Sequence, residues 1–346
     1  MKRRNLQGLL LALALAGCGK GDEDAHRSRV EREMKVWLVT KVRAFRGAAE
    51  ELQQAAPTPA GRGWDATQDA QAIEAMKAAW GRAREAYELI EGAVAPLFPE
   101  SDTATDARYD DFLLQLGAQG DRTPFDDQGV IGVHAIERIL WADAIPAETV
   151  EFEKGLPGYR PAAFPASEAE ARDFKDKLAA RLVKDIQELE NQLGPLELDI
   201  AFAFRGLMDL IAEQLEKVDR AATGREESRY AQSTLHDLRA NRDGCQDAYR
   251  IFRPWLVARG RADLDEQVMA GFERLKVSYD ALPGRAIPRP PQGWSSLEPK
   301  PEHAGTPFGK LFTLVSQETD DQRPTSLSGS LMSVADALGL PKAVLR

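Results

Sequence analysis

The sequence predicts an all-α protein built from antiparallel helices of bundle length. Apolar residues recur every three or four positions through most of the chain, which is the period of one helix face. No convincing stretch alternates apolar and polar residues as a half-buried β-strand would. Segments rich in proline and glycine separate the periodic stretches, and such segments form turns between helices.

The first 17 residues read as a lipoprotein signal peptide. Lys2, Arg3 and Arg4 precede an apolar run over 9–16, and residues 15–18 have the lipobox sequence LAGC. The apolar run is shorter than the roughly 20 residues that a membrane-spanning helix needs. Cleavage before Cys18 would leave a lipid anchor, with 18–28 as a polar tether. Because Gly19 stands where an aspartate would favour the inner membrane, we expect a periplasm-facing protein on the outer membrane.

Four helices are expected in the first part of the chain. Their apolar positions repeat at helical spacing over 30–52, 69–97, 103–117 and 130–141. The third begins with a cluster of acidic residues, which is typical of the positive end of a helix. The following segment, 146–166, is rich in glycine, proline and aromatic residues. We therefore expect a first helical bundle over 29–145, a linker over 146–166 and a second bundle over 167–346.

Six further helices are expected in the second part. The periodic stretches cover 167–193, 196–218, 226–257, 263–282, 308–315 and 326–338. Pro195 suits the first turn of the helix expected at 196–218. The segment 283–307 contains too many prolines for a regular helix, so it is expected to be a crossover between helices.

Charge and cysteine content narrow the class of function. The chain has 55 acidic and 45 basic residues and a net charge of −10. An acidic protein repels nucleic acid and attracts cations, so nucleic-acid binding is not expected. With Cys18 acylated, Cys245 is the only other cysteine and no intrachain disulfide can form. Stability must come from burial of the 43% of residues that are hydrophobic.

A candidate metal site lies in the stretch 130–141. His134 and Glu137 are three residues apart on a predicted helix, so both side chains can face one guest. Imidazole and carboxylate groups suit first-row metal ions. Glu88 and Glu91 repeat the spacing on another predicted helix, and bundles can bring such pairs to one interior metal site. Two unrelated surface pairs are the alternative interpretation.

Four stretches resemble motifs of the imelysin-like family, which includes the EfeO/EfeM-type periplasmic iron-uptake proteins. Residues 132–141, GVHAIERILW, resemble the family's GxHxxE signature. The stretch 226–256 looks like EExRYSxTDLxDxxANxDGA followed by FRPxL, while 83–98 and 105–111 resemble YExIEPxAxxF and IDxRxDD. The motifs occur in family order. The chain departs from them at Gly92, where proline is usual, and at Ala231 and Gln232.

The resemblance implies a bilobal all-α fold, with two helical bundles and a cleft between them. It also implies a metal site on the HxxE motif, with His134, Glu137, Glu88, Glu91 and Asp106 as ligands. The arrangement is similar to the shorter EfeM-like members, which lack a cupredoxin domain. It implies iron capture, or delivery of iron to an inner-membrane permease with a periplasmic peroxidase as a further partner.

The metal and the class of activity stay open at this point. Iron is the expected metal, and zinc or copper are alternatives because the histidine also suits them. One alternative function is an imelysin-type metallopeptidase, although the sequence lacks the HExxH motif. Another is metal-dependent binding of an acidic polysaccharide, against which the acidic composition argues.

Overall fold

The computed structural model describes residues 20–340, and every regular element among them is helical. The expected signal segment and Cys18 lie outside the described residues. In chain order the elements are α1 (Lys20–Ala55), α2 (Ala70–Glu88), α3 (Glu91–Leu97), α4 (Pro99–Asp106), α5 (Tyr109–Leu116), η1 (Gly117–Gln119), α6 (Gly132–Leu140), α7 (Ala147–Lys154), α8 (Glu168–Asp173), the π-helical turn η2 (Phe174–Leu178), α9 (Ala179–Leu193), α10 (Ile200–Asp219), α11 (Thr234–Ala258), α12 (Ala262–Asp280), η3 (Pro301–His303), α13 (Pro307–Thr319) and α14 (Leu327–Leu338). The predicted all-α class is confirmed.

The helix expected over 69–97 is two helices, α2 and α3. The chain turns at Leu89 and Ile90, where the amide of Ile90 donates to the carbonyl of Tyr87 instead of continuing the α-helical pattern. A neighbouring helix packs closely against the break. A Cβ atom on Gly244 of α11 would lie 2.1 Å from the carbonyl oxygen of Leu89, so α11 passes directly against this turn. The break separates Glu88, the last residue of α2, from Glu91, the first residue of α3.

The helix expected over 103–117 is also divided, into α4 and α5. Ala107 and Arg108 between them have extended backbone conformations, and the carboxylate of Asp111 accepts a hydrogen bond from the amide of Arg108. The first of the two helices starts earlier than expected, with Pro99 in its first turn. As a result Asp106 is the last residue of α4, and its side chain lies at a helix end.

Two helix starts expected in the second half need correction. The helix expected from 226 begins only at Thr234, because the residues from 220 to 233 form turns. The helix expected from 196 begins at Ile200, where the side chain of Asp199 accepts a hydrogen bond from the amide of Ala201 and caps the helix. The segment expected as a linker, 146–166, contains α7, and its role as a linker stays a prediction.

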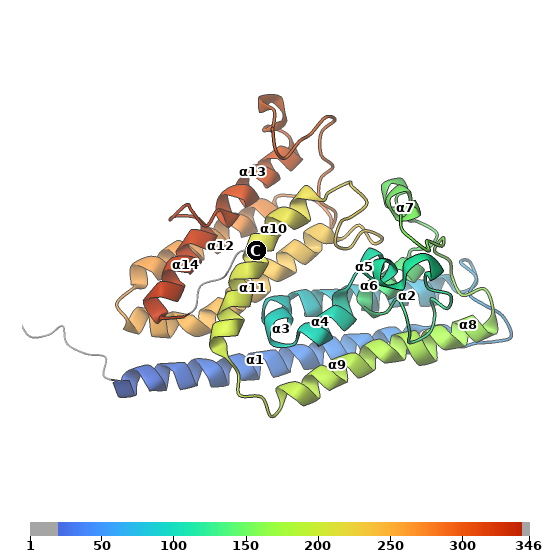
Figure 1. Cartoon of the computed structure of the whole chain (residues 1–346), viewed down its shortest axis with the longest axis horizontal. Helices are drawn as coiled ribbons and strands as arrows, with labels where there is room; N and C mark the ends of the chain where they lie inside the picture. The colour runs from blue at the N-terminus through green and yellow to red at the C-terminus, as the bar shows by residue number, and fades with distance from the viewer. Residues whose placement is uncertain (1–19, 341–346) are drawn as a thin grey trace, which may run out of the picture.

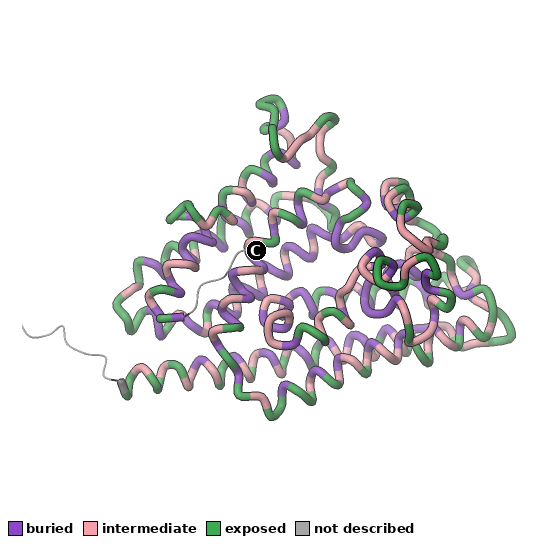
Figure 2. Tube along the Cα trace, in the orientation of Figure 1, coloured by how far each residue is buried: buried purple, intermediate pink, exposed green. Residues whose placement is uncertain are grey.

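The helices pack around one continuous apolar core. α1 lies along the base of the molecule and contacts both α2 and α9 (Figure 1). α10 contacts α3, α11 and α13, and α12 packs on α11 and α14. Buried and exposed positions alternate along α1, as expected for a helix with one face on the core (Figure 2). Contacts between α1 and α9 cross the expected bundle boundary, so the division into two bundles stays a prediction.

No helix within residues 20–340 combines the length and the apolar character that a membrane crossing requires.

Candidate metal centre

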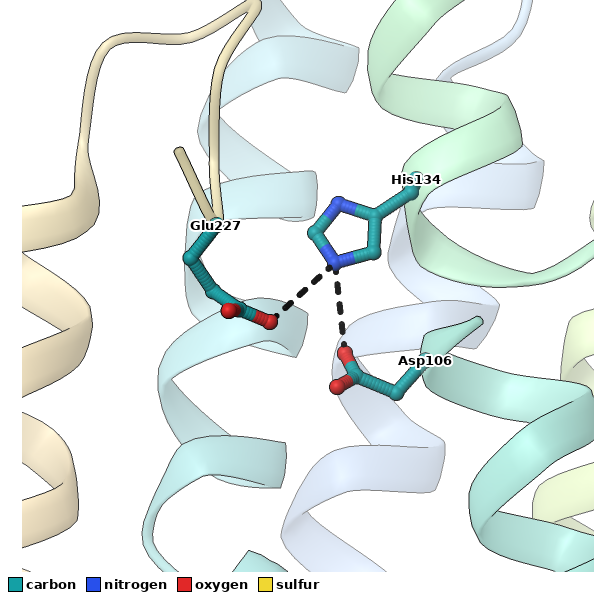
Figure 3. Close-up of side chains that lie close together, drawn as sticks. All are labelled: Asp106, His134 and Glu227. Carbon is teal, nitrogen blue, oxygen red and sulfur yellow. Dashed lines mark ion pairs between the residues drawn. The ribbon is translucent and has the colours of Figure 1, made fainter. Parts of the chain in front are cut away.

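Three segments that are distant in the sequence meet at one buried group of side chains. They are the first turn of α6 with His134, the end of α4 with Asp106, and the turn before α11 with Glu227 (Figure 3). The Nε2 atom of His134 lies 3.4 Å from Oδ1 of Asp106 and 3.8 Å from Oε1 of Glu227. One ligand atom from each residue lies within 4.8 Å of the others.

These separations suit ligands of one metal ion. Protein nitrogen and oxygen atoms bind zinc and similar metals at about 2.0–2.2 Å, so two neighbouring ligands of one ion lie about 3–3.5 Å apart. The distance from Nε2 to Asp106 already lies in this range, and the distance to Glu227 needs to shorten by only a few tenths of an ångström. We therefore regard Asp106, His134 and Glu227 as the candidate metal centre.

Glu137 holds the imidazole ring in place. Its Oε2 atom lies 2.8 Å from Nδ1 of His134. Its Oε1 atom accepts hydrogen bonds from the backbone amides of Tyr230, at 3.0 Å, and Ala231, at 2.8 Å. A metal-binding histidine commonly donates its second ring nitrogen to a carboxylate in this way, which fixes the tautomer and aims the other nitrogen. The HxxE pair is thus a histidine aimed at the centre and a glutamate that positions it.

Gly132 allows α6 to begin directly against α4. Its φ angle is +84°, a conformation that side chains with a Cβ atom rarely adopt. A Cβ atom here would lie 2.4 Å from the carbonyl oxygen of Thr105, the residue before Asp106. The indole nitrogen of Trp80 on α2 donates to the carbonyl of Val133 at 2.9 Å and fixes the same turn from another side. The glycine of the GxHxxE motif therefore brings His134 to Asp106.

The charges of the three side chains depend on one another. Burial and the positive charge of Arg84 would lower the pKa of His134, yet the nearby carboxylates of Asp106 and Glu227 and the hydrogen bond with Glu137 raise that pKa well above its usual range. Burial would raise the pKa of Asp106, but Arg84 and His134 keep it below its usual value. Burial would also raise the pKa of Glu227, but Lys217, His134 and Arg84 hold that pKa well below its usual value. The imidazole and the two carboxylates thus influence one another electrostatically, and a metal can bind Nε2 only when this atom carries no proton.

Glu88 and Glu91 lie in an adjoining network of opposite charges. Lys217 on α10 donates to Oε2 of Glu91 at 3.1 Å and lies 3.5 Å from Oε2 of Glu88. The side-chain amide of Asn241 on α11 donates to Oε2 of Glu88 at 2.5 Å and of Glu91 at 2.8 Å. Glu88 also pairs with Arg84. These contacts bring both glutamates near the centre but direct their oxygens at cations and an amide, so their ligand role stays a prediction.

A cavity of about 510 Å³ opens beside the candidate metal centre. Its walls come from α3, α4, α5, α10 and the turn before α11, and both Asp106 and Glu227 line it. Carboxylates outnumber cations on these walls: Glu91, Asp102, Asp106, Asp111, Glu213, Glu216 and Glu227 face Arg108, Lys217 and Arg220. An acidic cavity concentrates cations. It provides a route for a metal ion to reach the centre from solvent.

Sequence reasoning brought two of the three residues of the centre together and missed the third. His134 and Asp106 were expected as ligands, whereas Glu227 received no role. Glu227 belongs to the stretch 226–230 that resembles the family motif. Because a helix was predicted over 226–257, the turn in which Glu227 lies was not predicted. The amides of Tyr230 and Ala231 that bind Glu137 belong to this same turn. An acidic pair followed by an arginine and a tyrosine was the available signal.

Comparison with known proteins places the chain in a family. A family model described as Imelysin matches residues 38–307. The iron uptake system component EfeO of Escherichia coli strain K12 and that of Shigella flexneri are each 27% identical over 203 residues. This match covers 59% of this chain and 43% of each relative, so the similar stretch spans less than half of the curated proteins.

The fold agrees with a solved structure of the same kind. An imelysin-like protein from Psychrobacter arcticum 273-4 superposes with a TM-score of 0.59 over 96% of this chain and 100% of the other, at 10% sequence identity. At this identity the likeness concerns the fold. The family model, in contrast, matches most of the sequence. The chain therefore belongs to the imelysin family.

Proposed function

We propose that this protein binds a metal ion, foremost iron, at Asp106, His134 and Glu227 and acts in iron uptake. The observation that carries the proposal is the convergence of Nε2 of His134 with two carboxylates at 3.4 and 3.8 Å. Glu137 holds the imidazole for this purpose, and the acidic cavity beside the centre supports access by a cation. The expected ligand roles of Glu88, Glu91 and Glu137 are carried as further predictions.

The choice of iron rests on ligand chemistry and on the relatives. Two carboxylates suit a hard ion such as Fe(III), while the imidazole also suits Fe(II), Zn(II) or Cu(II). The relatives named as iron uptake system components favour iron. Zinc and copper are the alternatives.

The cellular setting is part of the proposal. With a lipid on Cys18, the protein would be anchored in the bacterial envelope, facing the periplasm and on the outer membrane in preference to the inner. It would capture iron there and deliver it to an inner-membrane permease, with a periplasmic peroxidase as a further partner.

Metal titration of variants tests the site. We expect Fe(II), added under anaerobic conditions, to bind the wild-type protein and to bind at least roughly tenfold more weakly to His134→Ala, Asp106→Asn and Glu227→Gln. His26→Ala is the matched control, because His26 lies at the start of α1 and is not part of the candidate metal centre. If the double variant His134→Ala/Glu137→Ala binds iron as tightly as wild type, the proposed site is wrong.

A further inference from the structure

Arg84 on α2 is a fully buried cation inside the candidate metal centre. Its side chain has no solvent exposure and its guanidinium faces four carboxylates. Nη1 pairs with Oδ1 of Asp106, and Nη2 lies 3.3 Å from Oε1 of Glu227 and also pairs with Glu88. Nε lies 3.8 Å from Oδ1 of Asp237.

The guanidinium uses the same oxygen atoms that face His134. Oδ1 of Asp106 is the atom nearest to Nε2 of the histidine, and Oε1 of Glu227 is the second. A metal bound through these two oxygens and Nε2 would stand where Arg84 now supplies positive charge. Two cations cannot both be held closely by the same oxygens without strong repulsion at short range.

The structure also provides a second position for the guanidinium. Nε of Arg84 and Oδ1 of Asp237 are both buried, and neither makes a hydrogen bond. A shift of Arg84 toward Asp237 would form this bond and keep the contact with Glu88 while it releases Asp106 and Glu227. A buried charge stays paired in both positions, which avoids the large cost of an isolated one.

We propose that Arg84 is an internal competitor of the metal: it pairs with Asp106 and Glu227 in the metal-free protein and moves to Asp237 and Glu88 when a metal binds. This inference rests on the proposed function. Arg84 keeps the carboxylates together while no metal is bound, and it weakens metal binding so that the ion can be passed on. A residue of this kind sets affinity without being a ligand.

Another buried arginine, Arg138, has no partner in the candidate metal centre. Arg138 on α6 pairs with Glu153 at 3.0 Å and donates to the carbonyl of Arg160 at 2.6 Å. None of these partners belongs to the candidate metal centre. Arg84 differs because two of its four carboxylate partners are proposed ligands.

Zinc affinity measured by chelator competition tests the proposal, with Zn(II) as a redox-inert probe. We expect Arg84→Met to bind at least tenfold more tightly than wild type. If the single variant does not fold, the double variant Arg84→Met/Asp237→Asn takes its place. It removes one charge of each sign, so Asp237 is not left as an unpaired charge, and it should also bind zinc more tightly than wild type. Arg253→Met is the matched control. It also removes one positive charge, together with two hydrogen bonds to Asp265, and it should bind zinc as tightly as wild type does.

The outcomes separate this proposal from the proposed function. If wild type and His134→Ala bind zinc equally, both are wrong. If binding requires His134 and the folded Arg84 variants show no gain, only the competitor role is wrong. A crystal structure of the zinc-loaded wild-type protein gives a second measurement: we expect Arg84 to lie beyond hydrogen-bond distance of Asp106, and a retained bond beside bound zinc would overturn the proposal.

Discussion

At the residue scale, the candidate metal centre is a set of side chains whose roles depend on their partners. His134 and Glu137 form a common pattern in sequence, but the structure gives them different tasks. The histidine is aimed at Asp106 and Glu227, and the glutamate is fixed by two backbone amides from another part of the chain. Arg84 and Arg138 differ in the same way. Arg84 contacts oxygens of two proposed ligands, and Arg138 contacts neither.

Asp102 should make the stability of the metal-free protein depend on pH. Burial, with the nearby charge of Asp106, raises the pKa of Asp102 to about 7, although a hydrogen bond from the hydroxyl of Tyr87 acts in the opposite direction. Unfolding lets this carboxyl titrate near its ordinary value of about 3.9. Between these two values the unfolded state has lost the proton while the folded state keeps it, so the contribution of Asp102 to stability falls as pH rises.

Replacing Asp102 by asparagine removes this loss of stability at high pH, because an amide does not titrate. We expect the free energy of unfolding of Asp102→Asn, measured relative to wild type, to increase by roughly 1–2 kcal/mol from pH 4 to pH 8. This value is reduced for solvent screening of a partly exposed group. Urea unfolding with a metal chelator present measures the gain at both pH values. Equal differences at pH 4 and pH 8 would contradict the prediction.

At the element scale, breaks between helices place the centre. The division of α4 from α5 puts Asp106 at a helix end, and the turn before α11 presents Glu227 and the amides that bind Glu137. Two residues of this turn region, Ala222 and Gln232, have positive φ angles of 57° and 51°. Such conformations cost free energy in residues other than glycine and persist only where surrounding contacts enforce them.

Gly132→Ala should disturb the junction of α6 with α4. The added Cβ atom meets the carbonyl of Thr105 and forces a residue with a side chain into a positive φ angle. We expect a loss of about 2–4 kcal/mol in the free energy of unfolding, and weaker metal binding because His134 is displaced. Chemical denaturation and metal titration measure the two effects.

Gly47→Ala is the matched control for this substitution. Gly47 lies within α1, and a Cβ atom there would meet nothing within 4 Å. Since alanine favours the helix, this variant should be more stable by about 0.5–1 kcal/mol. Equal stability of Gly132→Ala and wild type would show that the close approach at α6 does not matter.

At the scale of the whole molecule, the described helices share one core. Buried apolar side chains form a single cluster that extends from Val30 on α1 to Leu340 after α14. α1 contacts α10 and α11 as well as α2 and α9, so it connects the expected bundles. The candidate metal centre and its cavity draw residues from both sides of the expected boundary at 146–166.

We expect the protein to unfold in a single cooperative transition, because the buried apolar side chains of the described residues form one cluster that spans both expected bundles. Differential scanning calorimetry in the presence of a metal chelator is the measurement, with agreement between the calorimetric and van't Hoff enthalpies as the criterion. Two separate transitions would show instead that 29–145 and 167–346 behave as independent units.

The sequence by itself determined the all-α class, most of the helices and the family, because apolar periodicity and local motifs are carried by neighbouring residues. It also singled out His134 and Asp106. Only the tertiary structure decided where helices stop. The turn at Leu89 packs against Gly244, and that contact joins residues far apart in the chain.

The same reason explains the candidate metal centre. The contacts of Glu227 and Arg84 with the centre, and the two backbone amides that fix Glu137, join segments that are distant in the sequence. A buried carboxylate can bind a metal, orient a histidine or pair with an arginine. Its partners in three dimensions decide which, because burial makes each unpaired charge costly.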